Sequence, residues 1–401
     1  MTWKDRGTAA AIAGASMLLC AATAGWGAAH AGIPLSHLGV YFDGHLYLEI
    51  AKSFPLPFSS EGPDYLGQAP GYPAAIWLVR QFLPGAFANW GFSALLVAWS
   101  GAGGAAIAVW ALAREVGLRP LWPTAFFLLA YPRWLSVAST AHPESLAVAF
   151  SVASVLWYLR GRIGASMVWL ALAGLVRYPA LLLGVPLALG ILFQRRERGL
   201  RTWLWLSLPP LAFAAVQVYL YLAVPGFAGI LDAHSVFWEA GFSWPFAALL
   251  EFAPRARVLW SLPDFWWTAV FVLTYGSLLF YLSSLWVGFR RLPSHFFVLP
   301  GAVAVVVGFH VCLEGPPAAW DFSRLTLLAW PFALLIHARW WGTRQAKPLL
   351  ALLGVGLAVA SFWYATTAAR GAVELQSRRH PFLEQTRERL DSDVPVWASF
   401  D

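Results

Sequence analysis

The sequence predicts an all-α polytopic membrane protein, because it is rich in apolar residues, poor in charge and arranged in repeated apolar runs. Of its 401 residues, 59% are hydrophobic and only 12% are charged, whereas an ordinary soluble domain carries about 25% charged residues. The net charge is +7, but the basic residues lie between the apolar runs and not on one soluble face. Membrane lipids are therefore expected partners, and nucleic acid is not.

Apolar runs that we interpret as membrane-spanning helices recur about eleven times along the chain. Their boundaries are good to a few residues, and they lie at residues 8–29, 87–113, 121–141, 144–159, 163–177, 179–193, 202–223, 266–288, 296–313, 323–337 and 348–368. The run at 8–29 follows Lys4 and Arg6 and ends near a sequence, Ala28 to Gly32, that a signal peptidase can accept. It is either an uncleaved first span, which its length favours, or a cleaved signal peptide.

The distribution of charge orients these spans. With the N-terminus in the cytoplasm, the acids of the cytoplasmic segments are only Asp5, Glu115 and Glu197. The basic residues of the same segments are Lys4, Arg6, Arg114, Arg119, Arg160, Arg162, Arg195, Arg196, Arg198, Arg201, Arg290, Arg291, Arg339, Arg344 and Lys347. This partition is the one that the positive-inside rule requires, so the longer polar segments are expected on the extracytoplasmic side.

Two stretches are predicted to be hairpins for the same reason. If residues 163–193 formed one helix, the basic residues at its two ends would lie on opposite sides of the membrane. We therefore expect outer turns at Arg177-Tyr178-Pro179 and, within residues 121–159, at His142-Pro143-Glu144. The helices around the first turn are short, so local thinning of the bilayer or a partly re-entrant path is expected there.

The chain is expected to form one transmembrane domain over residues 1–368 and an extracytoplasmic tail over 369–401. The domain has two long outer segments, at 30–86 and 224–265, and loops of such length in a compact bundle usually carry function. The small-residue run at 101–104 predicts close helix packing. The cytoplasmic segments are too short for a nucleotide-binding domain, and the sequence contains no Walker-type loop, GxGxxG loop or zinc-site spacing. The two cysteines lie in separate apolar runs, so neither a disulfide framework nor a cysteine metal site is expected.

The first outer segment contains an acid in an amphipathic pattern. Between Phe42 and Ala51, a helix would place Asp43, Tyr47 and Ile50 on one face. Two interpretations of Asp43 are open. It caps an amphipathic helix on the membrane surface, or it is a general base, since a carboxylate at the edge of a low-dielectric bundle has a raised affinity for protons and can take one from a hydroxyl.

Two further motifs on the outer side also have a structural and a functional interpretation. The turn around Tyr72, in Ala69-Pro70-Gly71-Tyr72-Pro73, either simply leads into the second span or belongs to a site. His142 and Glu144 flank Pro143 at a predicted helix start, where an acid complements the positive helix end. As an acid at membrane depth on the same side as Asp43, Glu144 is also a candidate to orient an acceptor or to hold a cation.

Arg177 and Arg324 border apolar spans on the outer side, against the positive-inside trend. We expect each to have a partner. That partner is either a ligand phosphate, which a guanidinium grips with two hydrogen bonds, or an acid of the chain, such as Asp321 for Arg324. His45 and His142 lie beside candidate acids. No set of metal ligands is predicted, and a divalent cation between these groups stays open.

Taken together, these segments resemble the GT-C superfamily of polyprenyl-phosphate-sugar-dependent glycosyltransferases. The nearest pattern is that of the bacterial branch related to the glycosylphosphatidylinositol mannosyltransferase that adds the second mannose. The shared features are an aromatic-Asp-small pattern followed by Tyr and Ile-Ala, a Pro-x-Tyr-Pro turn, a Glu-Ser pair opening a span, and an arginine ending an apolar helix. The matching residues are Phe42, Asp43, Gly44, Tyr47, Ile50, Ala51, Pro70, Gly71, Tyr72, Pro73, Glu144, Ser145 and Arg177.

The resemblance implies a GT-C-like bundle in a bacterial inner membrane, with the active site on the extracytoplasmic side. It implies inverting transfer of a hexose, such as mannose, from a polyprenyl-phosphate donor to a hydroxyl of a glycan, lipid or protein. Asp43 is then the catalytic base, and Arg177 or Arg324 binds the donor phosphate. The residues that bind sugar or acceptor, or that support the site, are then His45, Tyr47, Tyr72, His142 and Glu144.

Two other functions fit the topology. A transporter or flippase of a lipid-linked sugar also has about a dozen spans, but such proteins usually contain inverted repeats and interrupted helices. No repeat stands out in this sequence. A non-catalytic membrane scaffold is the other alternative, and it gives no reason for long outer loops that hold an acid near the membrane.

Overall fold

The structure is a computed structural model of a helical chain. It describes residues 3–41, 43–54, 68–194, 199–223, 227, 229, 230, 241–252, 265–314, 321–340, 355–367 and 391. Within these ranges there is no β-strand, and one isolated antiparallel bridge joins Phe242 to Leu313. Most of the outer segment predicted at 224–265 and, apart from Asp391, the tail predicted at 369–401 lie outside the described residues.

Among the described residues, five helices are long and apolar enough to cross a membrane. They belong to α1 (Trp3–Ala31), α5 (Trp90–Glu115), α11 (Leu200–Ala223), α14 (Phe265–Arg291) and a segment that joins η5 (Ser294–Phe296) to α15 (Val298–Val311). By length and composition, these helices bear out the prediction of an all-α membrane protein. The count of eleven spans stays a prediction.

Shorter helices lie at the other predicted spans and in the first outer segment. In that segment they are η1 (Leu35–Gly39), α2 (Gly44–Ser53), α4 (Gly71–Phe82) and η2 (Gly85–Phe87). At the spans they are α6 (Leu121–Leu129), α7 (Pro132–Ser139), α8 (Glu144–Leu159), α9 (Ile163–Val176), α10 (Gly184–Leu189), α17 (Phe322–Leu325), α18 (Trp330–Trp340) and a helix over residues 355–367.

One of the predicted spans is interrupted, and two others are continuous helical segments whose helix type changes along their length. These irregularities were not predicted from the sequence. The span at 121–141 breaks between α6 and α7, because Pro132 begins a new helix and has no N–H to continue the old one. Residues 178–194 form η3 (Tyr178–Leu183), α10 and the π-helical η4 (Gly190–Gln194). Residues 322–340 form α17, η6 (Thr326–Ala329) and α18. An arginine lies in or next to each of these irregular segments: Arg133, Arg177 and Arg324.

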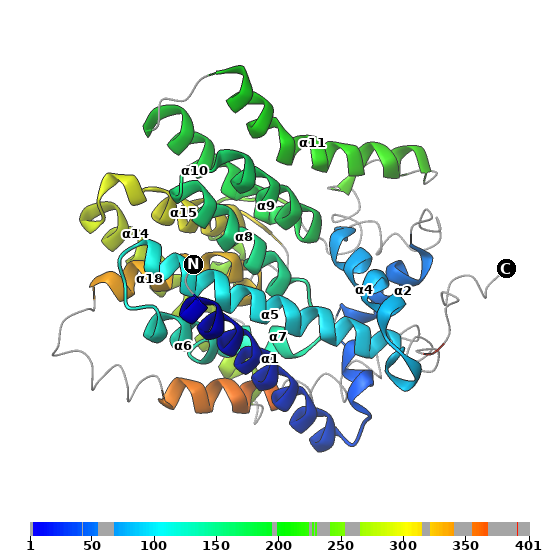
Figure 1. Ribbon diagram of the computed structural model, residues 1–401. Helices are drawn as coiled ribbons and strands as arrows, with labels where there is room; N and C mark the ends of the chain where they lie inside the picture. The colour runs from blue at the N-terminus through cyan, green and yellow to red at the C-terminus, as the bar shows by residue number, and fades with distance from the viewer. Residues whose placement is uncertain are drawn as a thin grey trace.

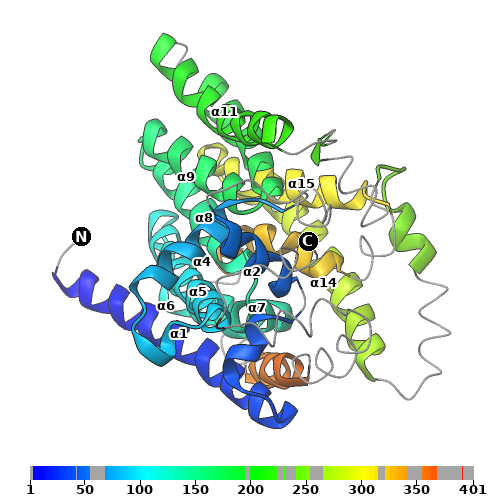
Figure 2. The same cartoon turned by 90° about the vertical axis from the view of Figure 1, so that its right-hand side faces the viewer.

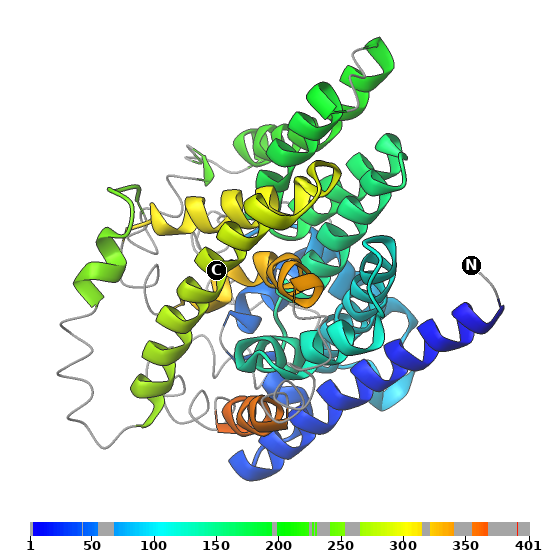
Figure 3. The ribbon, with the colours of Figure 1, turned by 90° about the vertical axis from the view of Figure 1, so that its left-hand side faces the viewer.

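The helices stack in layers, with α5 near the centre. α1, α5, α8, α9 and α11 pack one against the next in that order (Figure 1), and α14, α15 and α18 pack together beside them (Figure 3). α5 and α8 approach closely, because a Cβ on Gly101 would lie 2.7 Å from the backbone nitrogen of Leu146. Ser145 beside it donates a hydrogen bond of 2.8 Å to the carbonyl oxygen of Ala98. The small-residue run thus serves helix packing, as predicted.

The hairpin predicted at Arg177-Tyr178-Pro179 is confirmed. Gly174 of α9 lies against the Leu181 side chain of η3, and a Cβ on Gly184 of α10 would lie 3.5 Å from the side chain of Leu170. Contacts between residues placed symmetrically about the turn mean that the chain folds back on itself. Arg177 therefore lies at one end of the bundle.

α8 connects two ends of the bundle that differ in charge. At its C-terminal end, Arg160 pairs with Glu115 at 2.9 Å, and Arg114 pairs with Asp5 at 2.6 Å. We call this the basic end. Glu144, the first of the 16 residues of α8, lies at the opposite end, about 24 Å away at about 1.5 Å per residue. α2 and α4 lie near that opposite end, which faces the viewer in Figure 2.

Candidate functional site

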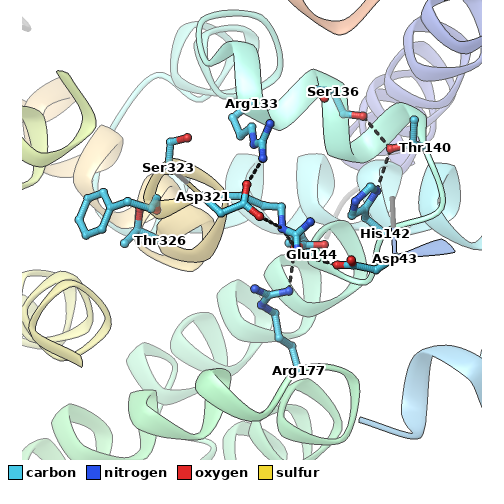
Figure 4. A network of polar contacts seen from close by, with 12 residues as sticks. Asp43, Arg133, Ser136, Thr140, His142, Glu144, Arg177, Asp321, Ser323 and Thr326 are labelled. Atoms are coloured by element: carbon cyan, nitrogen blue, oxygen red, sulfur yellow. Dashed lines mark hydrogen bonds and ion pairs between the residues drawn. The ribbon is translucent and has the colours of Figure 1, made fainter. Parts of the chain in front are cut away.

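Arginines and carboxylates from separate segments meet at the end of the bundle opposite the basic end. We call this group the arginine–carboxylate cluster, and it consists of Asp43, Arg133, Glu144, Arg177, Asp321 and Arg324 (Figure 4). Its members come from the turn before α2, from α7, from the start of α8, from the end of α9, and from α17 with its N-cap. The packing of helix ends therefore assembles the cluster.

Arg324 is the centre of the cluster, because its guanidinium contacts three carboxylates. Nη2 donates a hydrogen bond to Oδ2 of Asp43 at 2.6 Å. Nε lies 3.2 Å from Oε1 of Glu144 and 3.5 Å from Oδ2 of Asp321. The arginine side chain is only 12% exposed, and a charge buried to this degree needs such partners. Asp321, which the sequence offered as a partner of Arg324, is therefore one of three carboxylates that contact this arginine.

Two further arginines each contact a carboxylate that Arg324 also contacts. Arg177 donates from Nη1 to Oε1 of Glu144 at 2.7 Å. Arg133 donates from Nη2 to Oδ1 of Asp321, and from Nη1 to the hydroxyl of Tyr364 at 2.7 Å. Three arginines thus face three carboxylates, and the formal charge of the cluster is balanced.

Glu144 has the structural role that the sequence suggested, and its carboxylate also belongs to the cluster. It begins α8 directly after Pro143, where a negative side chain complements the positive helix end. Its carboxylate is 1% exposed and is the counter-ion of both Arg177 and Arg324. The structural role therefore does not remove Glu144 from the candidate site.

Asp43 occupies the N-cap position of α2, but its side chain makes no capping hydrogen bond. The carboxylate turns to Arg324 instead and stays 15% exposed. Close backbone contact fixes this turn, because a Cβ on Gly44 would lie 2.3 Å from the carbonyl oxygen of Gly39 and 3.5 Å from Cβ of Ala141. The same contact brings the turn of Asp43 next to that of His142.

The pKa of Asp43 corrects one expectation. Burial alone would raise it, but the charges of Arg324 and His142 and the hydrogen bond from Arg324 lower the pKa to about 2. The raised proton affinity expected from the sequence is therefore wrong for this arrangement, because Arg324 stabilises the carboxylate. Asp43 becomes a stronger base only when this pairing weakens.

His142 lies beside this pair and is uncharged at neutral pH, because burial lowers its pKa to about 4. Thr140 donates its hydroxyl proton to the carbonyl oxygen of Ser136 at 2.9 Å, and Oγ1 of Thr140 lies 2.8 Å from Nδ1 of His142. The hydroxyl has one proton, so the direction of the second contact depends on the tautomer of the imidazole.

The first-segment residues beside Asp43 are mainly packed into the protein. His45 is buried in the first turn of α2 and adds to the positive field at Asp43. Tyr47 and Tyr72 are buried with their rings edge to face, 5.2 Å between centroids. The hydroxyl of Tyr72 donates to the carbonyl oxygen of Ala94 at 3.0 Å, which ties α4 to α5. In this structure Tyr72 therefore has a packing role.

The turn before α4 also supports the cluster. Gly71 lies so close to the end of α9 that a Cβ would be 2.7 Å from the carbonyl oxygen of Leu175. Arg177 follows two residues later. The Pro-x-Tyr-Pro turn thus packs against the helix end that presents Arg177.

Three features of the cluster were not predicted from the sequence. They are the roles of Arg133 and Tyr364 and the position of Asp321 between Arg133 and Arg324. The available signal was an arginine directly after Pro132, inside an apolar run, and the i, i+3 spacing of Asp321 and Arg324. Among the described residues, no three His, Cys, Asp or Glu side chains are grouped as the ligands of a metal ion. What the cluster offers is a partly exposed carboxylate beside guanidinium groups, an arrangement that suits a hydroxyl and a phosphate.

No family model matches this chain, and no curated protein matches its sequence.

Proposed function

We propose that this protein is a membrane glycosyltransferase that moves a hexose from a polyprenyl-phosphate donor to an acceptor hydroxyl. The observation that supports it best is the pairing of Asp43 with Arg324, 281 residues later, at a partly exposed edge of the cluster. A base for a hydroxyl and a binding group for a phosphate are then neighbours. Mannose, and a glycan, lipid or protein acceptor, are the substrates that the family resemblance favours.

In the proposed step, the acceptor oxygen attacks the anomeric carbon of the donor. The bond between that carbon and the phosphate oxygen breaks, and its electron pair leaves with the phosphate. The acceptor proton passes to Asp43, which acts as general base. The guanidinium of Arg324, helped by Arg177, stabilises the negative charge that develops on the leaving phosphate. Attack from the side opposite the leaving group inverts the configuration.

The proposed location is the extracytoplasmic face of a bacterial inner membrane, with a cytoplasmic N-terminus. The separation of charges supports this orientation. Arg114, Arg160 and Arg339 lie near one another at the basic end, since Arg160 pairs with Glu115 and Arg339 donates to the carbonyl oxygen of Val116. The positive-inside rule would place that end in the cytoplasm and the cluster on the outside.

A flippase of a lipid-linked sugar is the second candidate. The irregular helices at 178–194 and 322–340, which contain 3₁₀ or π turns, favour it, because transporters often build their sites from helices of irregular geometry. Arg324 lies in one of these segments and Arg177 just before the other. A flippase would use the cluster to hold the lipid phosphate during translocation.

The test is transfer by the purified protein in detergent micelles. A polyprenyl-phosphate [³H]hexose is supplied with acceptors extracted from the source membranes, and radiolabelled product is followed. A glycosyltransferase forms product without a sealed membrane, whereas a flippase only moves the donor across sealed vesicles. Product that forms from the lipid donor, and not from a nucleotide sugar, would support the proposal. Translocation in vesicles without transfer in micelles would overturn it.

A further inference from the structure

The carboxylates of the cluster differ in how many arginines hold them. Glu144 contacts Arg177 and Arg324, and Asp321 contacts Arg133 and Arg324. Among the described residues, Asp43 has an ion pair with Arg324 alone. If Arg324 turned toward an incoming anion, Glu144 and Asp321 would each keep an arginine, whereas Asp43 would lose its ion pair.

The balance of charge points to the same carboxylate. Three arginines and three carboxylates cancel, and His142 is neutral at pH 7 because burial lowers its pKa. A phosphodiester brings one further negative charge into this balanced group. The proton affinity of the carboxylates then rises, and it rises most for the carboxylate with the fewest cations.

We infer that the donor phosphate and Asp43 compete for Arg324, so that donor binding itself turns Asp43 into the base. This inference rests on the proposed function. It links donor binding to the activation of Asp43, two events that could otherwise be independent. Without donor, Arg324 holds Asp43 as a weak base. With donor, Arg324 is on the phosphate, and Asp43 is ready for the proton of the acceptor.

The groups that face Asp43 are consistent with this direction. Arg324 from α17 is its cation, whereas His142 from the turn before α8 and His45 from α2 add positive charge only when they are protonated. Tyr47 from α2 and Glu144 from α8 provide no cation. Once Arg324 turns away, burial and the nearby phosphate both favour the protonated carboxyl, so its pKa rises from about 2 toward or above its ordinary value.

Charge also balances over the reaction. The donor phosphodiester carries one negative charge, and the polyprenyl phosphate that leaves carries one more. Asp43 loses its negative charge when it takes the acceptor proton, so the total charge of the cluster and its ligand is unchanged. When the lipid phosphate dissociates and the proton leaves Asp43, Arg324 can pair with Asp43 again. The cluster is then ready for the next donor.

The test is calorimetric titration of the full-length protein in detergent with a polyprenyl methyl phosphodiester. This probe has one negative charge, no proton to exchange above about pH 3 and no sugar to transfer. Measurements at pH 5 in two buffers with different enthalpies of protonation give the protons taken up per probe bound. At pH 5 we expect the protein to take up a fraction of a proton per probe bound. This fraction should decrease as the pH rises to 8. We expect Asp43→Asn to abolish the uptake.

The same variant gives a second, independent readout. Because Asp43→Asn removes the charge that competes for Arg324, it should bind the phosphodiester about tenfold more tightly at pH 7, within the usual range of coupling between sites. A residue that merely supported the fold would not produce tighter binding. Arg324→Lys keeps the charge but lacks the planar fork, so its probe affinity should be lower and its proton uptake smaller.

Asp5→Asn is the matched control, because Asp5 contacts Arg114 at the same distance of 2.6 Å at the basic end. It should leave affinity and proton uptake unchanged. If the unaltered protein binds the phosphodiester without proton uptake, or if Asp43→Asn binds it more weakly, the competition is refuted while the proposed transfer can still stand. If the unaltered protein does not bind the phosphodiester, both the competition and the proposed donor site are refuted.

Discussion

Both ends of the helix bundle contain ion pairs between arginine and a carboxylate, but the surroundings of the pairs differ. At the basic end, Arg114 and Asp5 are 46% and 21% exposed and Arg160 and Glu115 are similarly open. Exposed pairs of this kind contribute about 0–1 kcal/mol to stability. In the cluster, the arginines and carboxylates are largely buried and share partners. There, loss of one member leaves a buried charge uncompensated, which costs about 3–5 kcal/mol.

The difference shows why contact distance alone does not identify a site. Arg114–Asp5 and Arg324–Asp43 have the same length, 2.6 Å. Only the second pair belongs to a network in which moving one guanidinium alters the protonation of a neighbour. Burial and shared partners, and not the presence of an ion pair, make the cluster the candidate site.

The largest effect on stability is expected from Arg324→Ala. It removes the cation shared by three carboxylates, so the free energy of unfolding should decrease by about 3–5 kcal/mol. Arg114→Ala at the basic end should change it by less than about 1 kcal/mol. Denaturation of both variants in the same detergent measures the difference. Equal losses would mean that the cluster is no more strongly coupled than the surface pairs.

A smaller effect is expected from Tyr364→Phe. The variant removes the hydroxyl that accepts from Nη1 of Arg133 at 2.7 Å, and hydrogen bonds to charged groups are worth about 1.5–3 kcal/mol. Tyr221→Phe, on the exposed surface of α11, is the control and should be nearly neutral. Thermal unfolding monitored by tryptophan fluorescence compares them. An unchanged Tyr364→Phe protein would show that Tyr364 does not hold Arg133.

The smallest expected effect on stability is a loss that appears only at acidic pH. The pKa values of Asp43 and Asp321 are lowered by the neighbouring arginines against the opposing effect of burial. The stability that these groups provide is therefore complete above their ordinary pKa of about 3.9. It is lost as the pH falls through the folded-state pKa, about 2 for Asp43. The unfolding temperature should drop between about pH 5 and pH 2.

Asp43→Asn should flatten this decline, whereas Asp5→Asn should follow the unaltered protein. A decline that is the same in all three proteins would place the acid sensitivity outside the cluster.

Much of the helical framework could be predicted, because long apolar runs end at basic residues or prolines. The predicted span at 144–159 coincides with α8, and that at 163–177 differs from α9 by one residue. The break at Pro132 and the change of helix type around Arg324 were not predicted. Hydropathy averages over a window and does not detect one proline or a charge that is paired across the bundle.

The candidate site was partly predictable for a similar reason. Asp43, Glu144, Arg177 and Arg324 each interrupt a local pattern, and the structure brings all four together. Their pairing depends on residues far apart in the chain, and no local pattern contains it. The lowered pKa of Asp43 was missed because it depends on Arg324, and the role of Arg133 was missed because Asp321 is 188 residues away.

The most direct test of the account is single-turnover transfer by Asp43→Asn and Asp5→Asn, both reconstituted with a polyprenyl-phosphate hexose and extracted acceptors. Loss of a general base lowers the rate of the chemical step by about 10²–10⁴-fold. We expect that loss for Asp43→Asn and a rate within about twofold of the unaltered protein for Asp5→Asn, which is far from the reacting groups. Undiminished transfer by a folded Asp43→Asn protein would contradict the role given to Asp43.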